Sequence, residues 1–194
     1  MAKHYQMDFQ EFLASDTSRY DYAIIDPPWN YDDKPPSIEN QLSYSLWDNM
    51  NLSDIFDKLS VKYIFLWITS SMLPVMFECL NNTKYVYKTL IPWIKTTTND
   101  TLFYGLGNTF RNCVEYVAVL QTTDAPVLRL QERNVIVAPT GKRTLKPKFW
   151  EESLCQTLSD KGLTGVYIFS GGELKFIDSV DTYTGPEVQK VLLF

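Results

Sequence analysis

Short apolar runs rich in β-branched and aromatic residues recur along this chain of 194 residues. Within each run the apolar side chains are nearly continuous, which is typical of strands that are buried on both faces of a sheet. The runs predict strands at 22–26, 63–69, 86–95, 114–121, 134–138 and 165–171.

Helix-like segments separate several of these strands. The sequence predicts helices at 52–59, 71–82 and 147–162. The last segment has Pro147 near its start and Gly162 near its end, where each residue type is favoured. Strands that alternate with helices predict an α/β fold, and the length fits a single domain that spans residues 1–194.

Polar loops follow several of the predicted strands. Open α/β sheets bind ligands beyond the carboxyl ends of their strands, so we expect these loops to build the functional site. The loops lie at 30–43, 96–112 and 139–146.

The composition limits the nucleic-acid, disulfide and metal interactions that the protein can be expected to make. A formal net charge of −5 and a pI near 4.9 argue against a protein that binds nucleic acid through its overall charge, although a local basic segment could still do so. The three cysteines are far apart and odd in number, which predicts neither a disulfide framework nor a cysteine metal site. The sequence offers no histidine–carboxylate cluster and no Ser-His-Asp set, so we expect no metal ion.

The sequence also gives no sign of a membrane or export segment. The first residues lack a charged start followed by an apolar run, and no stretch approaches the roughly 18 apolar residues of a membrane span. We therefore expect a cytoplasmic or nucleoid-associated protein without a signal peptide and without a membrane partner.

The stretch IIDPPWNY, at 24–31, ends an apolar strand with an acid and two prolines. Proline lacks an N–H and restricts the backbone of the residue before it, so Asp26-Pro27-Pro28 predicts a rigid, extended exit from the strand. A strand cap followed by a turn would explain an Asp-Pro pair alone. With Trp29 following, the segment is suited to hold a flat, polar object beyond the strand end.

An adenine base is such an object. Its exocyclic amine is a poor nucleophile because the nitrogen lone pair is delocalised into the ring. Asp26 and the carbonyl of Pro27 can each accept one amine hydrogen, and Trp29 or Tyr31 can stack on the base, which contributes roughly 1–3 kcal/mol per base. The segment therefore supplies the acceptors and the aromatic surface that chemistry at an adenine amine would need.

Asp26-Pro27-Pro28-Trp29 is the D-P-P-W form of an amino-methyltransferase motif, and further segments of the chain resemble one family. That family is the adenine-N6 methyltransferases, which include the catalytic subunit of the eukaryotic mRNA methyltransferase and many bacterial and phage relatives. The matching segments occur in the family's order with similar spacing and cover about residues 8 to 170. They are YSLWDNMNLSDI, YIFLWIT, LIPWIKT, GLGNTFRNCVEYVAVLQ and NVIVAPTGKRTLKP.

The resemblance implies a Rossmann-like, S-adenosylmethionine-dependent methyltransferase fold in permuted order, with the catalytic motif ahead of the cofactor strand. It implies methyl transfer from S-adenosylmethionine to the N6 amine of adenine in nucleic acid. We favour DNA over RNA as substrate because the resemblance has a bacterial or phage character. This family forms pairs of related chains, so a homodimer or heterodimer is a further expectation.

The resemblance also implies roles for individual residues. The catalytic motif comprises Asp26, Pro27, Pro28 and Trp29. The residues implied for S-adenosylmethionine are Asp8, Phe9, Asp26, Lys146, Ile168, Phe169, Ser170, Gly171 and Asp181. Those implied for the target are Tyr44, Lys95, Arg111, Asn112 and Glu115. The residues themselves add Tyr31 as a stacking surface and Lys142 and Arg143 as contacts to phosphates. The family's cofactor segment reads ELFxR, whereas this chain has YIFSGGELKFIDSVDTY.

Several residues also have a plainer interpretation. Phe65, Trp67 and Trp93 lie on predicted strands and are interpreted as core packing. The basic residues of TGKRTLKPK, at 140–148, fit either a solvated loop or a segment that binds phosphates. Two other functions stay open: a catalytically silent partner subunit that only holds nucleic acid, and methylation of a different amine.

Overall fold

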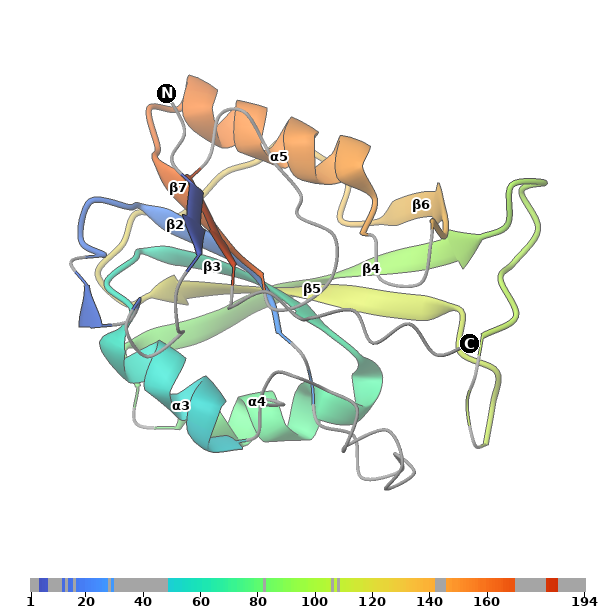
Figure 1. The fold of residues 1–194 in the computed structure, drawn as a ribbon, viewed down its shortest axis with the longest axis horizontal. Coiled ribbons are helices and arrows are strands. Elements are labelled where there is room, and N and C mark those ends of the chain that lie inside the picture. Colours follow the sequence, from blue (N-terminus) through green and yellow to red (C-terminus); the bar gives the residue numbers. More distant parts are fainter. Residues whose placement is uncertain are drawn as a thin grey trace.

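The structure of the protein is a computed structural model (Figure 1). It describes residues 4–6, 12, 14, 15, 17–27, 29, 49–81, 83–105, 107, 109–141, 146–169 and 181–184. The described strands form one sheet in the order β1-β8-β7-β2-β3-β5-β4-β6. They are β1 (His4–Gln6), β2 (Tyr22–Asp26), β3 (Tyr63–Ile68), β4 (Tyr85–Thr96), β5 (Val114–Thr122), β6 (Ile136–Pro139), β7 (Gly165–Phe169) and β8 (Asp181–Thr184). The helices are α3 (Asn49–Lys58), α4 (Leu73–Leu80) and α5 (Lys148–Asp160), with a 3-10 turn η1 at Ser70–Met72.

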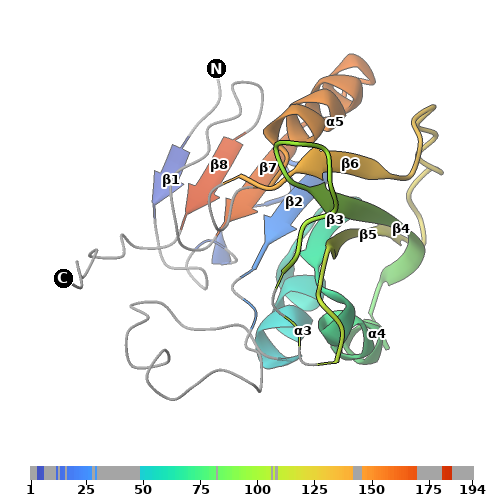
Figure 2. The same ribbon diagram turned by 90° about the vertical axis from the view of Figure 1, so that its right-hand side faces the viewer.

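The directions of the strands bring several strand ends to one edge of the sheet. Strands β1, β8, β7, β2 and β3 run parallel to one another, and Figure 2 shows the first four of these arrows pointing the same way. Strand β5 runs antiparallel to both of its neighbours, β3 and β4, and β6 runs parallel to β4. The carboxyl ends of β2, β4 and β7 and the amino end of β5 therefore lie at the same edge.

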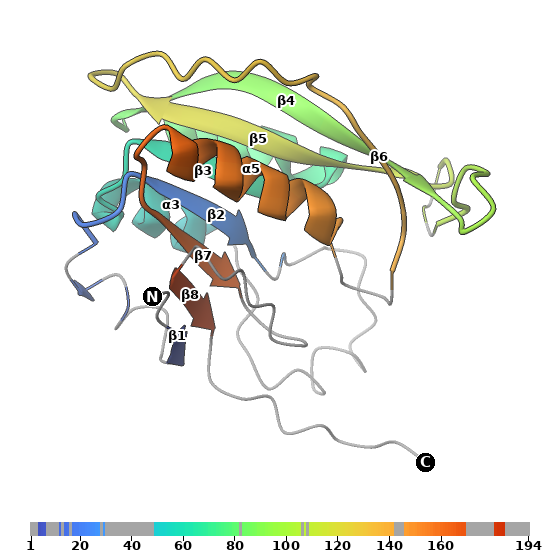
Figure 3. The ribbon, with the colours of Figure 1, turned by 90° about the horizontal axis from the view of Figure 1, so that it is seen from above.

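Helices cover both faces of the sheet. Helices α3 and α4 lie on one face and α5 lies on the other, where it crosses the strands β3, β2 and β7 (Figures 1 and 3). Successive side chains of a strand point to opposite faces. On β2, Ala23 and Ile25 join the core cluster of α3 and α4, whereas Tyr22 and Ile24 join the cluster of α5. Because both faces are buried, this strand reads as a continuous apolar run.

The predicted strands and helices are confirmed in position, with some shifted ends. Strand β2 has the predicted bounds, and β4 extends one residue beyond each end of the predicted range. The helix predicted at 71–82 is a 3-10 turn followed by α4, which has Pro74 in its first turn. A proline fits that place because the first turn of a helix needs no backbone donor. Strands β1 and β8 were not predicted.

The predicted core aromatic residues Phe65, Trp67 and Trp93 are confirmed as buried. The three cysteines are free thiols, and two of them, Cys79 and Cys155, are buried. Among the residues that the structure describes, no helix is both long enough and apolar enough to cross a membrane.

Candidate active site

Asp26 is the last residue of β2, a strand that pairs with β3 on one side and β7 on the other. Its backbone lies opposite that of Phe169, the last residue of β7. The side chain of Asp26 is only 11% exposed. A carboxylate that is so little exposed needs charged or hydrogen-bonding partners in place of the water molecules it has lost.

Lys146 is one such partner. Its Nζ lies 3.0 Å from Oδ1 of Asp26 and 3.0 Å from Oε2 of Glu115. Lys95 donates from its own Nζ to the other carboxylate oxygen of Glu115. Asp26, Lys146, Glu115 and Lys95 thus alternate in charge, and we call these residues the ionic chain.

The sheet explains why the ionic chain assembles. Asp26 ends β2, and Lys95 is the residue before the end of β4. Glu115 is the second residue of β5, which starts at this edge because it runs in the opposite direction. Lys146 lies between β6 and α5. Residues far apart in the sequence therefore meet at one edge of the sheet.

The ionic chain fixes the charge of two of its members. Burial opposes ionisation of Glu115, but the ammonium groups of Lys146 and Lys95 outweigh it and hold the Glu115 pKa below its ordinary value. Burial likewise opposes the charge of Lys146, yet Asp26 and Glu115 raise the Lys146 pKa well above the ordinary lysine value. Lys146 is therefore a fixed cation at neutral pH and does not act as a base there.

Two tryptophan rings lie against the lysines of the ionic chain. The Nζ of Lys146 lies 5.4 Å from the ring centroid of Trp67, and that of Lys95 lies 5.0 Å from the ring centroid of Trp93. The two rings meet edge-on, with their centroids 5.9 Å apart. Cation–π attraction contributes about 0.5–2 kcal/mol per pair. These tryptophans are therefore both core residues and supports of the site.

A further carboxylate, that of Glu151 on α5, holds the Trp67 ring from within the core. Glu151 is fully buried, and its Oε1 accepts hydrogen bonds from Nε1 of Trp67 at 3.0 Å and from the hydroxyl of Tyr167 at 2.9 Å. Burial and the nearby charge of Glu151 raise the Tyr167 pKa well above its ordinary value, so this hydroxyl stays a donor. Glu151 thus supports the ring against which Lys146 packs.

Sequence reasoning missed Glu151, although the sequence contains a signal for it. Glu151 is three residues before Leu154 and seven before Leu158, which places it on the buried face of α5 with both leucines. An acid on the apolar face of a helix needs a buried partner, and that requirement could have drawn attention to it.

Trp29 stabilises the turn that follows β2 through two hydrogen bonds. Its backbone N–H donates to the carbonyl of Pro27 at 3.0 Å, and its Nε1 donates to the carbonyl of Trp67 at 3.0 Å. Because a carbonyl oxygen has two lone pairs, that of Pro27 keeps capacity for a ligand amine. The Trp29 ring is 6% exposed and offers no open face for stacking in this structure. Tyr31, the other predicted stacking residue, lies outside the described residues.

Arg111 and Asn112 lie on the exposed connection between β4 and β5. The Nε of Arg111 donates to the hydroxyl of Tyr104 at 3.1 Å. The side-chain oxygen of Asn112 accepts the backbone N–H of Val114 at 3.0 Å, at the start of β5. Of the residues predicted to bind the target, Lys95 and Glu115 are thus linked to Asp26 through Lys146. Arg111 and Asn112 instead form hydrogen bonds within the connection between β4 and β5.

Two of the predicted cofactor residues, Ile168 and Asp181, lie on β7 and β8. The side chain of Ile168 is 1% exposed and packs in the core cluster with α3 and α4, so it faces the core and not the edge of the sheet. Asp181 is the first residue of β8, where it lies opposite Val166, whereas Thr184 lies level with Phe169. Asp181 is therefore about 10 Å from the edge that carries Asp26.

Other predicted site residues lie outside the described part of the chain, or only their backbone is described. Those outside it are Asp8, Phe9, Pro28, Tyr31, Tyr44, Lys142, Arg143, Ser170 and Gly171. Those with a described backbone alone are Phe169 and Asp181.

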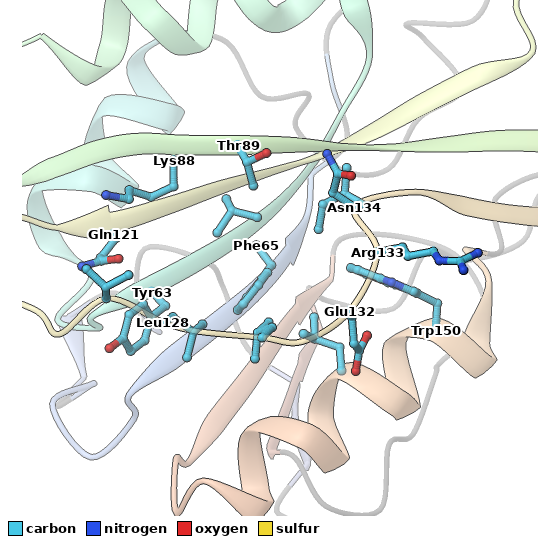
Figure 4. A pocket seen from close by; sticks show the side chains of 15 residues that line it. Tyr63, Phe65, Lys88, Thr89, Gln121, Leu128, Glu132, Arg133, Asn134 and Trp150 are labelled. Atoms are coloured by element: carbon cyan, nitrogen blue, oxygen red, sulfur yellow. The ribbon is translucent and has the colours of Figure 1, made fainter.

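An apolar cavity of about 180 Å³ lies on the α5 face of the sheet (Figure 4). Its wall includes Phe65 and Val119 on the sheet, Leu128 on the segment that crosses it, and Leu154 on α5. The lining contains none of the residues that the sequence implied for cofactor or target. The ionic chain, and not this cavity, is therefore the candidate site.

Comparison with known proteins places the chain in a family. The family model described as MT-A70 matches residues 20–170, a range that contains the D-P-P-W motif and the whole ionic chain. A search of the curated proteins found no match. The family model covers well over half of the chain. The chain therefore belongs to the MT-A70 family, a family of S-adenosylmethionine-dependent methyltransferases that includes the mRNA adenosine methyltransferase.

Proposed function

We propose that this protein transfers a methyl group from S-adenosylmethionine to the N6 amine of adenine in nucleic acid, with DNA favoured over RNA. The main support is the enclosed carboxylate of Asp26 in the D-P-P-W motif, 3.0 Å from Lys146, in a chain of a methyltransferase family. The preference for DNA rests on the bacterial or phage character of the sequence resemblance.

The proposal includes a Rossmann-like methyltransferase fold in permuted order. Strand β2, which carries the catalytic motif, comes early in the sequence and lies beside β7, the proposed cofactor strand from near its end. The helices on both faces and the reversed strand β5 support this interpretation.

The charges of the ionic chain fit the methionine end of S-adenosylmethionine, which carries an ammonium, a carboxylate and a sulfonium. Asp26 suits the positive groups, and Lys146 suits the carboxylate or a ribose hydroxyl, because charge-assisted hydrogen bonds are the strong ones. Asp26 and Lys146 are therefore the described residues that would hold the cofactor. When bound, the cofactor supplies an electrophilic methyl group.

Asp26 and Pro27 prepare the target amine in this mechanism. The carboxylate of Asp26 and the carbonyl of Pro27 each accept one amine hydrogen, which biases the nitrogen lone pair toward attack. Asp26 can also take the proton that the nitrogen loses, and a positioned general base of this kind contributes about 10²–10⁴ in rate. Lys146 keeps the carboxylate in place and balances its negative charge.

The target adenine has to leave its stack to reach Asp26. A base within a duplex would have to be flipped out, which costs a few kcal/mol, whereas a base in a single strand would not. We therefore expect single-stranded or locally opened nucleic acid to be the better substrate.

Transfer of a radiolabelled methyl group to single-stranded and duplex DNA and RNA tests the proposal. We expect label in nucleic acid that contains adenine, with more in DNA than in RNA. The Asp26→Asn variant should lose transfer by at least about a hundredfold. Asp21→Asn is the matched control, because Asp21 lies just before the amino end of the same strand, where it bonds Lys62 and Thr164. Absence of label in every nucleic acid, from a wild-type protein that binds S-adenosylmethionine, would refute the proposal.

A catalytically silent partner subunit is the second candidate. It is favoured by the buried side chain of Ile168, which packs in the core, and by the position of Asp181, whose backbone lies opposite Val166, three residues before the strand end at Phe169. Calorimetric titration with S-adenosylmethionine separates the two candidates. Binding supports the enzyme, and a protein that binds nucleic acid without binding the cofactor supports the silent subunit.

A further inference from the structure

The connection between β4 and β5 carries the most exposed large apolar side chains of the described residues. Phe110 is 85% exposed, Tyr104 is 75% exposed, and Leu102 on the same connection is 65% exposed. Large apolar groups gathered in the open on one segment are typical of an interaction site. We call Tyr104, Phe110 and Arg111 the hairpin surface.

The backbone beneath the hairpin surface is closely packed. The N–H of Gly105 donates to the carbonyl of Asn112 at 3.1 Å, which ties the two limbs of the connection together. A Cβ atom at Gly105 would lie 2.2 Å from the carbonyl oxygen of Asn112, and one at Gly107 would lie 2.0 Å from that of Phe110. Only glycine allows so close an approach of two limbs. The side chains of Tyr104 and Phe110 therefore project from a backbone that is held in place by close packing and a hydrogen bond.

Arg111 and Tyr104 form a preassembled pair on this support. The guanidinium carbon of Arg111 lies 5.1 Å from the ring centroid of Tyr104, and its Nε donates to the hydroxyl at 3.1 Å. A guanidinium has five N–H donors, so this bond leaves donors for a phosphate oxygen. The stretch from 101 to 112 contains no acid that would repel a polyanion.

The hairpin surface adjoins the ionic chain. The carbonyl of Lys95 accepts the N–H of Phe103 at 2.9 Å, and the N–H of Lys95 donates to the carbonyl of Cys113 at 2.8 Å. Phe103 and Cys113, which lie on either side of the hairpin surface in the sequence, are thus bonded to the backbone of a member of the site. The hairpin surface is therefore anchored at the same edge of the sheet that carries Asp26.

We propose that Tyr104 and Phe110 stack on unpaired bases that flank the target adenine, while Arg111 contacts a phosphate of the same strand. Aromatic rings beside an arginine bind single-stranded nucleic acid in this way without reading its sequence. The inference rests on the proposed function for its class of substrate. A protein partner also suits aromatic and arginine side chains, but the direct connection to a site for an unstacked base favours nucleic acid.

Fluorescence anisotropy with two labelled single-stranded DNA probes tests this inference. One probe has a single adenine among intact neighbours, and the other has abasic sites on both sides of that adenine. The tested variant is Tyr104→Leu with Phe110→Leu, which removes both rings and keeps apolar side chains. The matched control is Phe77→Leu with Tyr87→Leu, since these rings form an exposed pair elsewhere, 43% and 39% exposed, with centroids 5.2 Å apart.

We expect the hairpin variant to bind the intact probe about tenfold to a hundredfold more weakly than the wild type, from the lost stacking on the flanking bases. On the abasic probe the two proteins should bind alike, and the control variant should match the wild type on both probes. Parental affinity of the hairpin variant for the intact probe would overturn the inference. So would an equal loss on both probes, or a loss of self-association with unchanged DNA binding, which would make the surface a protein interface.

The outcome is separable from that of the proposed function, because binding is measured without S-adenosylmethionine. If the protein binds more tightly when the flanking bases are present but never transfers a methyl group, the stacking role of the hairpin surface is supported and the proposed methyltransferase activity is refuted. If the hairpin variant transfers methyl groups at the wild-type rate and binds DNA with wild-type affinity, the proposed activity is supported and the stacking role of the hairpin surface is refuted.

Discussion

Two carboxylate sites adjoin the Trp67 ring, one through Lys146 and the other through a hydrogen bond from the indole, and their partners differ in kind. Asp26 and Glu115 are paired with lysines at the edge of the sheet, where the four side chains are 11–18% exposed. Glu151 lies in the core, where the neutral donors of Trp67 and Tyr167 bond it. A lysine at the edge of the sheet can exchange its carboxylate for a ligand, whereas a buried indole N–H would be left without a partner. The edge group is therefore suited to chemistry, and the core group to support.

The largest effect on stability should follow the loss of the core carboxylate. Glu151→Ala leaves the indole of Trp67 and the hydroxyl of Tyr167 without their acceptor, which should lower the free energy of unfolding by about 3–5 kcal/mol. Glu151→Gln keeps an acceptor oxygen at the same place and should cost about 1–2 kcal/mol. Urea denaturation measures both, and a cost below about 1 kcal/mol for Glu151→Ala would remove its supporting role.

Loss of the central lysine of the ionic chain should affect both stability and ligand binding. Lys146→Met leaves Asp26 and Glu115 without their shared cation, which should lower the free energy of unfolding by about 2–3 kcal/mol and weaken binding of S-adenosylmethionine by about tenfold. Lys148→Met is the matched control, because Lys148 pairs at 3.3 Å with Glu152 at 65% and 48% exposure. That control should cost no more than about 0.5 kcal/mol. Equal cofactor affinity in both variants, measured by calorimetry, would contradict a cofactor role for Lys146.

The smallest effect concerns the acid side of the stability profile. The Glu115 pKa is lowered in the folded protein, so its ion pairs contribute stability that is complete above its ordinary value of 4.5 and is lost as the pH falls through the lower folded-state value. Glu115→Gln should therefore be about 1 kcal/mol less stable than the wild type at pH 7, and the difference should disappear toward about pH 3. A series of urea unfolding curves between these pH values checks this, and a constant difference would argue against the ion pairs as its cause.

The sequence predicted the central strands well, because their burial on both faces leaves continuous apolar runs such as Tyr22–Ile25. Strands β1 and β8 were missed because His4–Gln6 and Asp181–Thr184 are short and largely polar, and neither stretch forms an apolar run. Their pairing depends on neighbours that are distant in the sequence. A pattern within one segment carries no information on such pairing.

The site was predicted only in part. The family resemblance implied Asp26, Lys95, Glu115 and Lys146 as site residues, but the ion pairs among them depend on how the strands meet at one edge. Trp29 was interpreted as a stacking surface, whereas its indole bonds the carbonyl of Trp67 on the next strand of the sheet. A tryptophan that follows a motif looks the same in sequence whether its ring is open or buried.

Mass analysis of nucleosides tests most directly that the edge carboxylate acts on the adenine amine. Wild-type protein, Asp26→Asn and Asp21→Asn are each incubated with DNA and with S-adenosylmethionine that carries a deuterated methyl group, and the nucleic acid is then digested. We predict labelled N6-methyladenine nucleoside from the wild type and from Asp21→Asn, and at least about a hundredfold less from Asp26→Asn. Label on a different base, or an undiminished yield from Asp26→Asn, would contradict the assignment of adenine-N6 chemistry to this site.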